Sequence, residues 1–384
     1  MNVVKSIVSV AALCFAAFSL FPNRAPAAIE LPHGGIFINA YGEAAYTSNL
    51  FLTAEEESDV VITVLPSLEY LMAEGLVHFE AHAGVEFLRF IDWSELDTEN
   101  FKSNFLVSFP HEDRGRTFFF RLNGGFNEIT SATAVDGALV QEDELSVGAD
   151  LEYYFSDRTS ARLGTSYRDR DARTPGFASR GVTTVRLGPA HEFSERLTLF
   201  GTLRYRKTDV SGAAPVPALD SEDYSIIAGA EGRLLALLVG EVAVGVQRRT
   251  FDGDFEDQTE PYAFAGLTWE VDEMTEVNLS LTSDMQTSAS NLSGQTVLVS
   301  LEGVRRVGEK LRFNLGAGYE DSSYVRAGGG KREDDEWSVF GGAGYVLNRH
   351  VSLNWDLAFA QRNSSFAASN YDVVRTGLSV DARF

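Results

Sequence analysis

The chain has 384 residues, of which 44% are hydrophobic, and its formal net charge is −23. Such an acidic chain offers no surface that could neutralise phosphates, so nucleic acid is excluded as a partner. The single cysteine, Cys14, lies in the segment interpreted below as an export signal, and Leu13 rather than a small residue precedes it. We therefore expect no lipid anchor there, and no disulfide, thiolate metal site or cysteine nucleophile in the mature chain.

Residues 1–28 predict a Sec signal peptide. Lys5 is followed by an apolar core from Ile7 to Phe21 and then by the small residues Ala25-Pro26-Ala27-Ala28. A core of about fifteen residues is short for the alternative, a membrane-spanning helix. We expect cleavage after Ala27 or Ala28, which leaves one domain at 29–384.

Apolar and polar residues alternate from residue 36 to the end, which is typical of β-strands with two different faces. In the last segment the two faces carry Asp372, Val374, Thr376, Leu378, Val380, Ala382 and Phe384 against Tyr371, Val373, Arg375, Gly377, Ser379, Asp381 and Arg383. The strands are long, about 12 to 15 residues against about five or six in ordinary sheets. No second apolar layer exists for a soluble sandwich. The predicted fold is therefore all-β, a transmembrane antiparallel β-barrel.

Short and long connections take turns along the chain, as in outer-membrane barrels, where short turns face the periplasm and long loops face outward. The predicted periplasmic turns are 73–75, 156–158, 193–195, 271–273, 308–309 and 348–349, and the predicted outer loops are 47–59, 92–98, 128–141, 171–179, 211–220, 252–257, 287–291, 323–334 and 363–369. The eighteen or so predicted strands are 36–46, 60–71, 76–91, 98–109, 116–127, 142–155, 159–170, 180–192, 196–210, 222–234, 237–251, 258–270, 274–286, 292–304, 309–322, 335–347, 350–362 and 371–384.

An even strand count places both termini in the periplasm. The first strand must pair with the last, because an unpaired backbone N–H or C=O is costly in hydrocarbon. If the first strand failed to form, the count would fall back to sixteen.

The chain ends in Phe384, with Leu378, Val380 and Ala382 at alternating positions before it. This ending resembles the signal that the outer-membrane barrel-assembly machinery recognises, and the alternative is a last strand that ends in phenylalanine by chance. We expect the assembly machinery, outer-membrane lipid and lipopolysaccharide as partners.

Four short motifs near the N-terminus occur in a characteristic order. A first strand with Tyr41-Gly42-Glu43 leads to the turn Asn49-Leu50-Phe51-Leu52, then to Pro66-Ser67 in a second strand, and Phe87-Leu88-Arg89-Phe90 precedes an acidic loop. This order resembles the start of the putative β-barrel porin 2 family, although Thr47-Ser48 stands where members often carry acidic residues. The resemblance implies an outer-membrane barrel, and some members are similar to proteins encoded with exopolysaccharide or capsule systems. It supplies no catalytic or binding residues.

Charged residues on the polar faces are the candidates for lining a pore. They are Arg162, Arg168, Arg204, Arg206, Arg312, Arg362, Arg375, Asp356 and Glu320, with Arg383 also on a polar face. One interpretation is a charged wall that orients solutes. The other is a set of salt bridges, to acids such as Glu152, Glu320, Asp356 and Asp381, that hold neighbouring strands together. Both can apply at once.

Other clusters favour surface or lipid roles. The acidic runs 55–57, 95–97, 252–257 and 333–336 could bind divalent ions that bridge to lipopolysaccharide, but their spacing matches no calcium loop, so we expect a solvated surface and no metal site. Trp269, Trp337 and Trp355 fall on apolar faces, where lipid contact is expected. Phe200 and Tyr371 are the candidates for an inward sugar-stacking track.

Nothing in the sequence predicts an enzyme or a cofactor. His78 and His82 share one strand face, but a barrel lipase would need a histidine and a serine that face lipid together. No metal, phosphate or nucleotide motif is present. The leading hypothesis is a porin-like channel for small hydrophilic solutes. The alternatives are a barrel that serves exopolysaccharide export or anchoring and conducts little, with export proteins as partners, and a lipid-facing enzyme.

Overall fold

The computed structural model describes residues 27–72, 75–110, 117–133, 137–211, 219–252, 255–326 and 330–384. The predicted signal peptide therefore lies outside the described residues, except for its last two positions. Parts of the predicted connections 73–75, 128–141, 211–220, 252–257 and 323–334 also lie outside them. Within the described ranges, no helix has the length and apolar character needed to cross a membrane.

The described chain is almost entirely β-structure, with two short 3-10 helices, η1 (Ser94–Leu96) and η2 (Ala367–Ser369). The strands are β1 Ile29–Leu31, β2 Gly34–Thr47, β3 Asp59–Met72, β4 His78–Phe90, β5 Thr98–Phe109, β6 Phe118–Thr133, β7 Ala138–Ser156, β8 Thr159–Ala172, β9 Ser179–Ser194, β10 Leu197–Ser211, β11 Ser221–Leu235, β12 Leu238–Phe251, β13 Gln258–Asp272, β14 Thr275–Thr287, β15 Leu292–Val307, β16 Leu311–Arg326, β17 Lys331–Asn348, β18 Val351–Ser364 and β19 Tyr371–Arg383.

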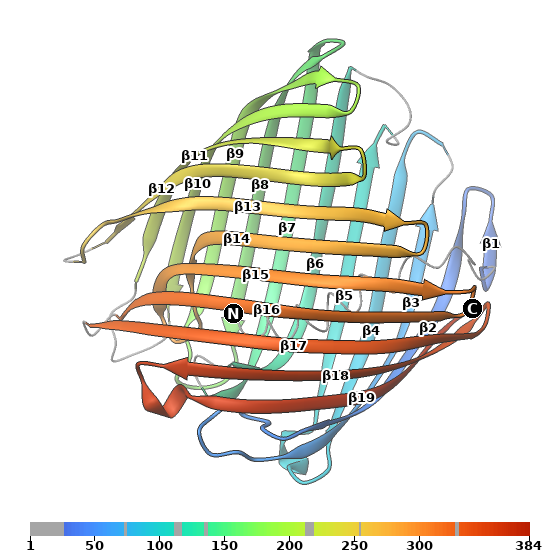
Figure 1. Cartoon of the computed structure of the whole chain (residues 1–384), viewed down its shortest axis with the longest axis vertical. Coiled ribbons are helices and arrows are strands. Elements are labelled where there is room, and N and C mark those ends of the chain that lie inside the picture. Colours follow the sequence, from blue (N-terminus) through green and yellow to red (C-terminus); the bar gives the residue numbers. More distant parts are fainter. Residues whose placement is uncertain are drawn as a thin grey trace.

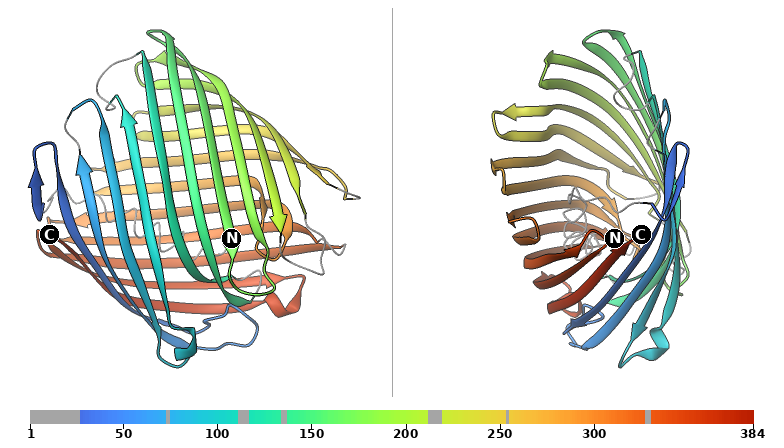
Figure 2. Two further views of the ribbon diagram at one scale, coloured as in Figure 1. Left: turned by 180° about the vertical axis from the view of Figure 1, so that it is seen from behind. Right: turned by 90° about the vertical axis from the view of Figure 1, so that its right-hand side faces the viewer.

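Strands β2 to β19 form a closed antiparallel barrel in which each strand pairs with its neighbours in sequence (Figures 1 and 2). The seam joins β19 to β2, with register from Arg375↔Thr47 to Arg383↔Asn39. The prediction of eighteen barrel strands is confirmed, and the first of them, β2, is fully formed. The short strand β1 was not predicted, and it adds only three pairs at the start of β2.

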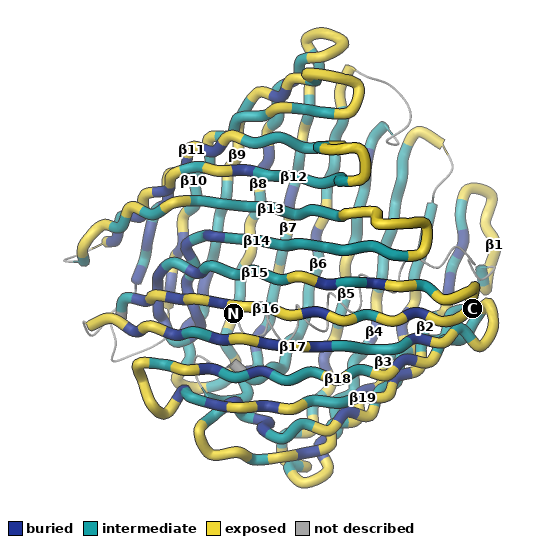
Figure 3. The backbone as a smooth tube through the Cα atoms, viewed as in Figure 1, coloured by how far each residue is buried: buried dark blue, intermediate teal, exposed yellow. Residues whose placement is uncertain are grey.

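The outer surface of the barrel carries the apolar residues. Leu315 is 68% exposed and Leu378 is 66% exposed, and the three tryptophans predicted to contact lipid are exposed as well. Buried and exposed positions alternate along most strands, as Figure 3 shows. This inversion of the usual burial pattern is what a barrel in hydrocarbon requires, since lipid covers the outer face and polar side chains face the interior.

Several hairpins extend further than the sequence pattern indicated. The predicted strands 142–155 and 335–347 are parts of β7 and β17, which begin at Ala138 and Lys331. The extension of β17 (331–334) is charged on both faces, and that of β7 (138–141) is mostly apolar, so neither shows an alternation of apolar and polar residues. Their backbone pairing continues nevertheless, because hydrogen bonding between strands does not depend on lipid contact. Below, the end of the barrel with the long connections is called the long-loop end, and the other the short-turn end.

Candidate functional site

The inner face of the barrel is polar and charged. All nine predicted pore-lining residues lie on it, with Arg162 and Arg168 on β8, Arg204 and Arg206 on β10, Arg312 and Glu320 on β16, Asp356 and Arg362 on β18, and Arg375 on β19. Their shared direction follows from the register, since residues paired across neighbouring strands point to the same face. That they line a path for solutes remains a prediction.

Most of these arginines contact carboxylates. Arg162 donates through Nε to Glu152 (2.9 Å) and through Nη2 to Glu231 on β11 (2.6 Å). Arg168 is about half exposed, and its Nε lies 3.8 Å from Glu144. The salt bridge between Arg162 and Glu152 is one that the sequence analysis anticipated, and it ties β7 to β8.

A buried ionic cluster occupies the inner face of β17 to β19 near the long-loop end. Arg362 donates to Asp334 (2.9 Å) and lies 3.5 Å from Glu336. Arg332 also donates to Asp334 (2.9 Å), and Tyr371 donates its hydroxyl proton to Glu336 (2.7 Å). All five side chains are buried. Removing one member of such a cluster costs several kcal/mol, because its partner would stay buried without compensation.

A second ionic cluster spans strands that are not neighbours. Arg204 and Arg206 on β10 both donate to Asp284 on β14, at 2.9 to 3.2 Å. Arg206 and Arg249 share Asp223 at 2.6 to 2.7 Å. In the sheet, three strands separate β10 from β14. The contact therefore crosses the interior, and the end of the β14–β15 hairpin must bend inward to make it.

The inward-bent end of the β14–β15 hairpin, residues 284–293, is called the inner hairpin. Its backbone oxygens at Met285 and Gln286 accept hydrogen bonds from Arg206 (2.7 Å) and Arg249 (3.1 Å). Arg249 also donates to the Ser293 hydroxyl (2.6 Å). In Figure 1 this hairpin stops short at the left, while β12–β13 and β16–β17 continue outward.

Neutral contacts hold the tip of the inner hairpin. The Ala178 N–H donates to the Ala289 carbonyl (2.9 Å), and the Leu219 N–H donates to Asn291 Oδ1 (3.1 Å). Leu292 packs on Tyr324 of β16. Asn291 adopts a positive φ of 55°, a conformation that asparagine tolerates better than most residues. Two long connections and one wall strand, β16, thus hold the tip of the inner hairpin in place.

A second segment, residues 48–58 between β2 and β3, lies against the inner wall of β18 and β19. The Asn49 amide donates to the carbonyls of Thr53 (2.7 Å) and Asp372 (3.3 Å). Leu52 is buried in a cluster with Ala360, Tyr371 and Val373. This segment contains the Asn-Leu-Phe-Leu turn singled out in the sequence, and its role here is to dock inside the barrel.

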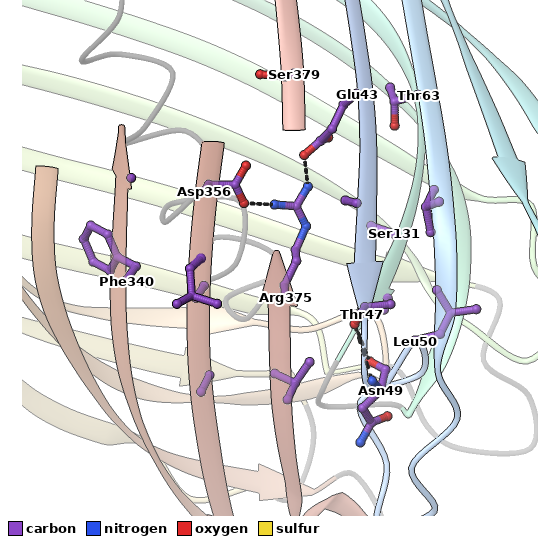
Figure 4. A pocket seen from close by; sticks show the side chains of 18 of the residues that line it. Glu43, Thr47, Asn49, Leu50, Thr63, Ser131, Phe340, Asp356, Arg375 and Ser379 are labelled. Atoms are coloured by element: carbon purple, nitrogen blue, oxygen red, sulfur yellow. Dashed lines mark hydrogen bonds and ion pairs between the residues drawn. The ribbon is translucent and has the colours of Figure 1, made fainter. Parts of the chain in front are cut away.

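A cavity of about 440 Å³ lies beneath residues 48–58, between β2–β4 and β17–β19. Arg375 stands in it between two carboxylates (Figure 4). It donates to Asp356 (2.7 Å) and to Glu43 on β2, across the seam. Leu50, Leu52 and Val373 line the end of the cavity toward the long loops. The cavity is therefore acidic in its middle and apolar at one end.

Other sequence candidates have different surroundings. Tyr371, a candidate for stacking on sugar, is buried in the Leu52 cluster and bonded to Glu336, which leaves its ring no free face. Phe200 lies inward, and its ring covers Gly229 of β11. His78 and His82 face the interior rather than lipid, because His82 pairs with the inward Glu69. Across the described ranges, no group of three or more histidine, cysteine or acidic side chains could hold a metal.

The predicted assembly signal lies at the seam. Phe384 exchanges backbone hydrogen bonds with Ile38 of β2, at 2.8 and 2.9 Å, and its ring stacks on His350. Leu378, Val380 and Phe384 are exposed on the outer face, and Ala382 lies on the same side. The terminal residue therefore also helps to close the barrel, which the sequence did not indicate.

The inner hairpin was missed in the sequence analysis, which treated 287–291 as one more outer loop. The available signal was composition. Residues 285–296 contain no charge and include Met285, Ala289 and Leu292, whereas the predicted outer loops 47–59, 92–98 and 252–257 are acidic. An uncharged segment with spaced apolar residues favours packing against a wall over exposure to water.

Comparison with known proteins confirms the fold. No curated protein matches the chain. The crystal structure of OccK2 (OpdF) from Pseudomonas aeruginosa in complex with glucuronate has a TM-score of 0.50 and 12% identity, and the match covers 93% of this chain and 100% of that one. OpdK, an outer membrane protein of the same organism, has a TM-score of 0.48 and 13% identity, and the match covers 91% of this chain and 99% of that one. At such identities the similarity shows the fold alone.

The family match falls on the C-terminal part of the chain and leaves out the N-terminal motifs at 41–90. It spans β11 to β19, and so includes the inner hairpin and the ionic cluster of β17 to β19. Residues 213–384 match the family model described as putative beta-barrel porin 2, the family that the N-terminal motifs resemble.

Proposed function

We propose that the protein is a porin-like channel of the outer membrane of a Gram-negative-type bacterium, which gives passive passage to small hydrophilic solutes. The observation that carries the proposal is the inverted barrel, with apolar residues outside and charged residues inside. A barrel of about this strand number is wide enough for an aqueous path. The inner hairpin and residues 48–58 narrow this path from the long-loop end.

The test is conductance. The mature protein, refolded and inserted into planar bilayers, should give discrete current steps, while the urea-unfolded protein at the same concentration should give none. A heat-modifiable, folded barrel without steps would overturn the channel proposal. That result would turn attention to the exopolysaccharide alternative, which no present observation favours.

Orientation has its own test. We propose that the short turns and both termini face the periplasm, as an even strand count requires. Glu309 lies in a short turn and Ala368 in a long connection, and both are exposed. In intact cells, a membrane-impermeant maleimide should label the variant Ala368→Cys and spare Glu309→Cys. The opposite pattern would contradict this orientation.

A further inference from the structure

The cavity beneath residues 48–58 has an excess of negative charge. Among the residues that line it, the carboxylates are Glu43, Glu86, Glu336, Asp356 and Asp381, and the one cationic side chain is Arg375. Glu86 is paired with Lys102 (3.2 Å) and Glu336 with Arg362 (3.5 Å). The excess therefore lies with Glu43, Asp356 and Asp381, of which Arg375 contacts the first two. Inside a barrel wall, where the effective dielectric is below that of water, such an excess attracts a cation.

Asn354 adds an independent observation. Its Nδ2 donates to Asp381 Oδ2 (2.7 Å) and lies 3.4 Å from the Ser379 hydroxyl. Because a carboxylate only accepts hydrogen bonds, this contact fixes which end of the amide is the oxygen. Asn354 is only 9% exposed, and its Oδ1 accepts no hydrogen bond from any described residue. A buried acceptor in this state is costly, and it lines the cavity.

The two neighbouring acceptors define the chemistry of a ligand. Asn354 Oδ1 and the Asp381 carboxylate would both be satisfied by one group with several N–H donors. The volume of about 440 Å³ lies within the usual range for small-molecule sites.

We propose that this cavity binds a small organic cation, an ammonium or guanidinium compound. The cationic group donates to Asn354 Oδ1 and to Asp381. The proposal rests on the proposed channel function and names the class of solute that the channel selects. An organic anion of the same size is disfavoured by the surrounding carboxylates.

Isothermal titration calorimetry on the refolded mature barrel in detergent tests the proposal, with 2-phenylethylammonium as the probe and 3-phenylpropionate as the anion of matched size. The ammonium should bind and the carboxylate should not. Asp381→Asn should weaken ammonium binding about tenfold, since it removes one charge-assisted hydrogen bond. The control is Asp150→Asn on β7, which is outside the cavity and should leave binding unchanged.

Two results would overturn the inference. One is equal binding of the ammonium and carboxylate probes, and the other is unchanged ammonium affinity in a folded Asp381→Asn barrel. Calorimetry does not depend on conduction, so the two proposals fail separately. Current steps without ammonium binding would refute the cation site alone. Ammonium binding without current steps would refute the channel alone.

Discussion

Arg249 should hold the inner hairpin in place. Its side chain is 1% exposed, and it donates both to Asp223 and to the hairpin, at the Gln286 carbonyl and the Ser293 hydroxyl. Arg249→Met keeps much of the volume and removes every donor. Asp223 retains Arg206 as a partner at 2.6 Å, so the barrel wall should survive the change.

The magnitude follows from the two shorter contacts to the hairpin, at Gln286 and Ser293, since the third, to Thr287 Oγ1, is 3.4 Å long. Each hydrogen bond to a charged group contributes about 1.5–3 kcal/mol, so the docked hairpin should lose about 3–6 kcal/mol. A change of about 1.4 kcal/mol alters an equilibrium constant tenfold. The equilibrium between docked and undocked hairpin should therefore shift toward the undocked state by roughly 10²- to 10⁴-fold. We expect single-channel recordings of Arg249→Met to show frequent transitions to a higher conductance that the parent protein rarely visits.

The matched control is Arg168→Met, which removes an inward arginine that makes only one long contact with Glu144 and does not touch the hairpin. It should alter ion selectivity without adding a conductance level. A folded Arg249→Met barrel with the same conductance levels and dwell times as the parent would show that Arg249 does not hold the hairpin.

Three further predictions test the tip, the lipid face and the seam. Ala178→Cys with Ala289→Cys, in a mature chain expected to lack other cysteines, should form a disulfide that suppresses the hairpin transitions until dithiothreitol is added; insensitivity to reductant would refute docking of the tip. Leu315→Arg should lower the free energy of unfolding in lipid by about 2 kcal/mol or more, measured by urea titration, and no change would contradict lipid contact at this position. Deleting Phe384 removes both backbone bonds to Ile38 and should cost about 1–3 kcal/mol in the same titration; an unchanged midpoint would mean that the seam does not depend on them.

The barrel itself was predictable because its determinants are local. A strand with two unlike faces shows a period of two in sequence, and β18 and β19 show it from end to end. Closure followed from the cost of unpaired backbone in hydrocarbon, without knowledge of any contact. Strand ends were less predictable, since the extension of β17 to Lys331 carries polar residues on both faces and has no periodic signal.

The interior was predictable in kind but not in arrangement. The sequence placed charged residues on the inner face and anticipated ion pairs between neighbouring strands, such as Arg375 with Asp356. It could not show that Arg204 meets Asp284 across the interior, because that contact depends on a bend in the hairpin. Nor could it show that Asn354 Oδ1 accepts no hydrogen bond from a described residue, because this depends on the orientation of one side-chain amide. Such features depend on tertiary geometry, which no period in the sequence records.

With the long-loop end facing outward, as proposed above, the inner hairpin affects what the cell surface displays. A turn enclosed by the barrel wall is out of reach of an antibody, a bacteriophage tail fibre or an extracellular protease. Its Met285, Ala289 and Leu292 are all buried, whereas Glu55 and Glu56 in the β2–β3 connection are exposed. Selection by external agents should therefore diversify the acidic connections, while packing restricts the hairpin. Antigenic variation and conduction would then be governed by different residues of the same barrel.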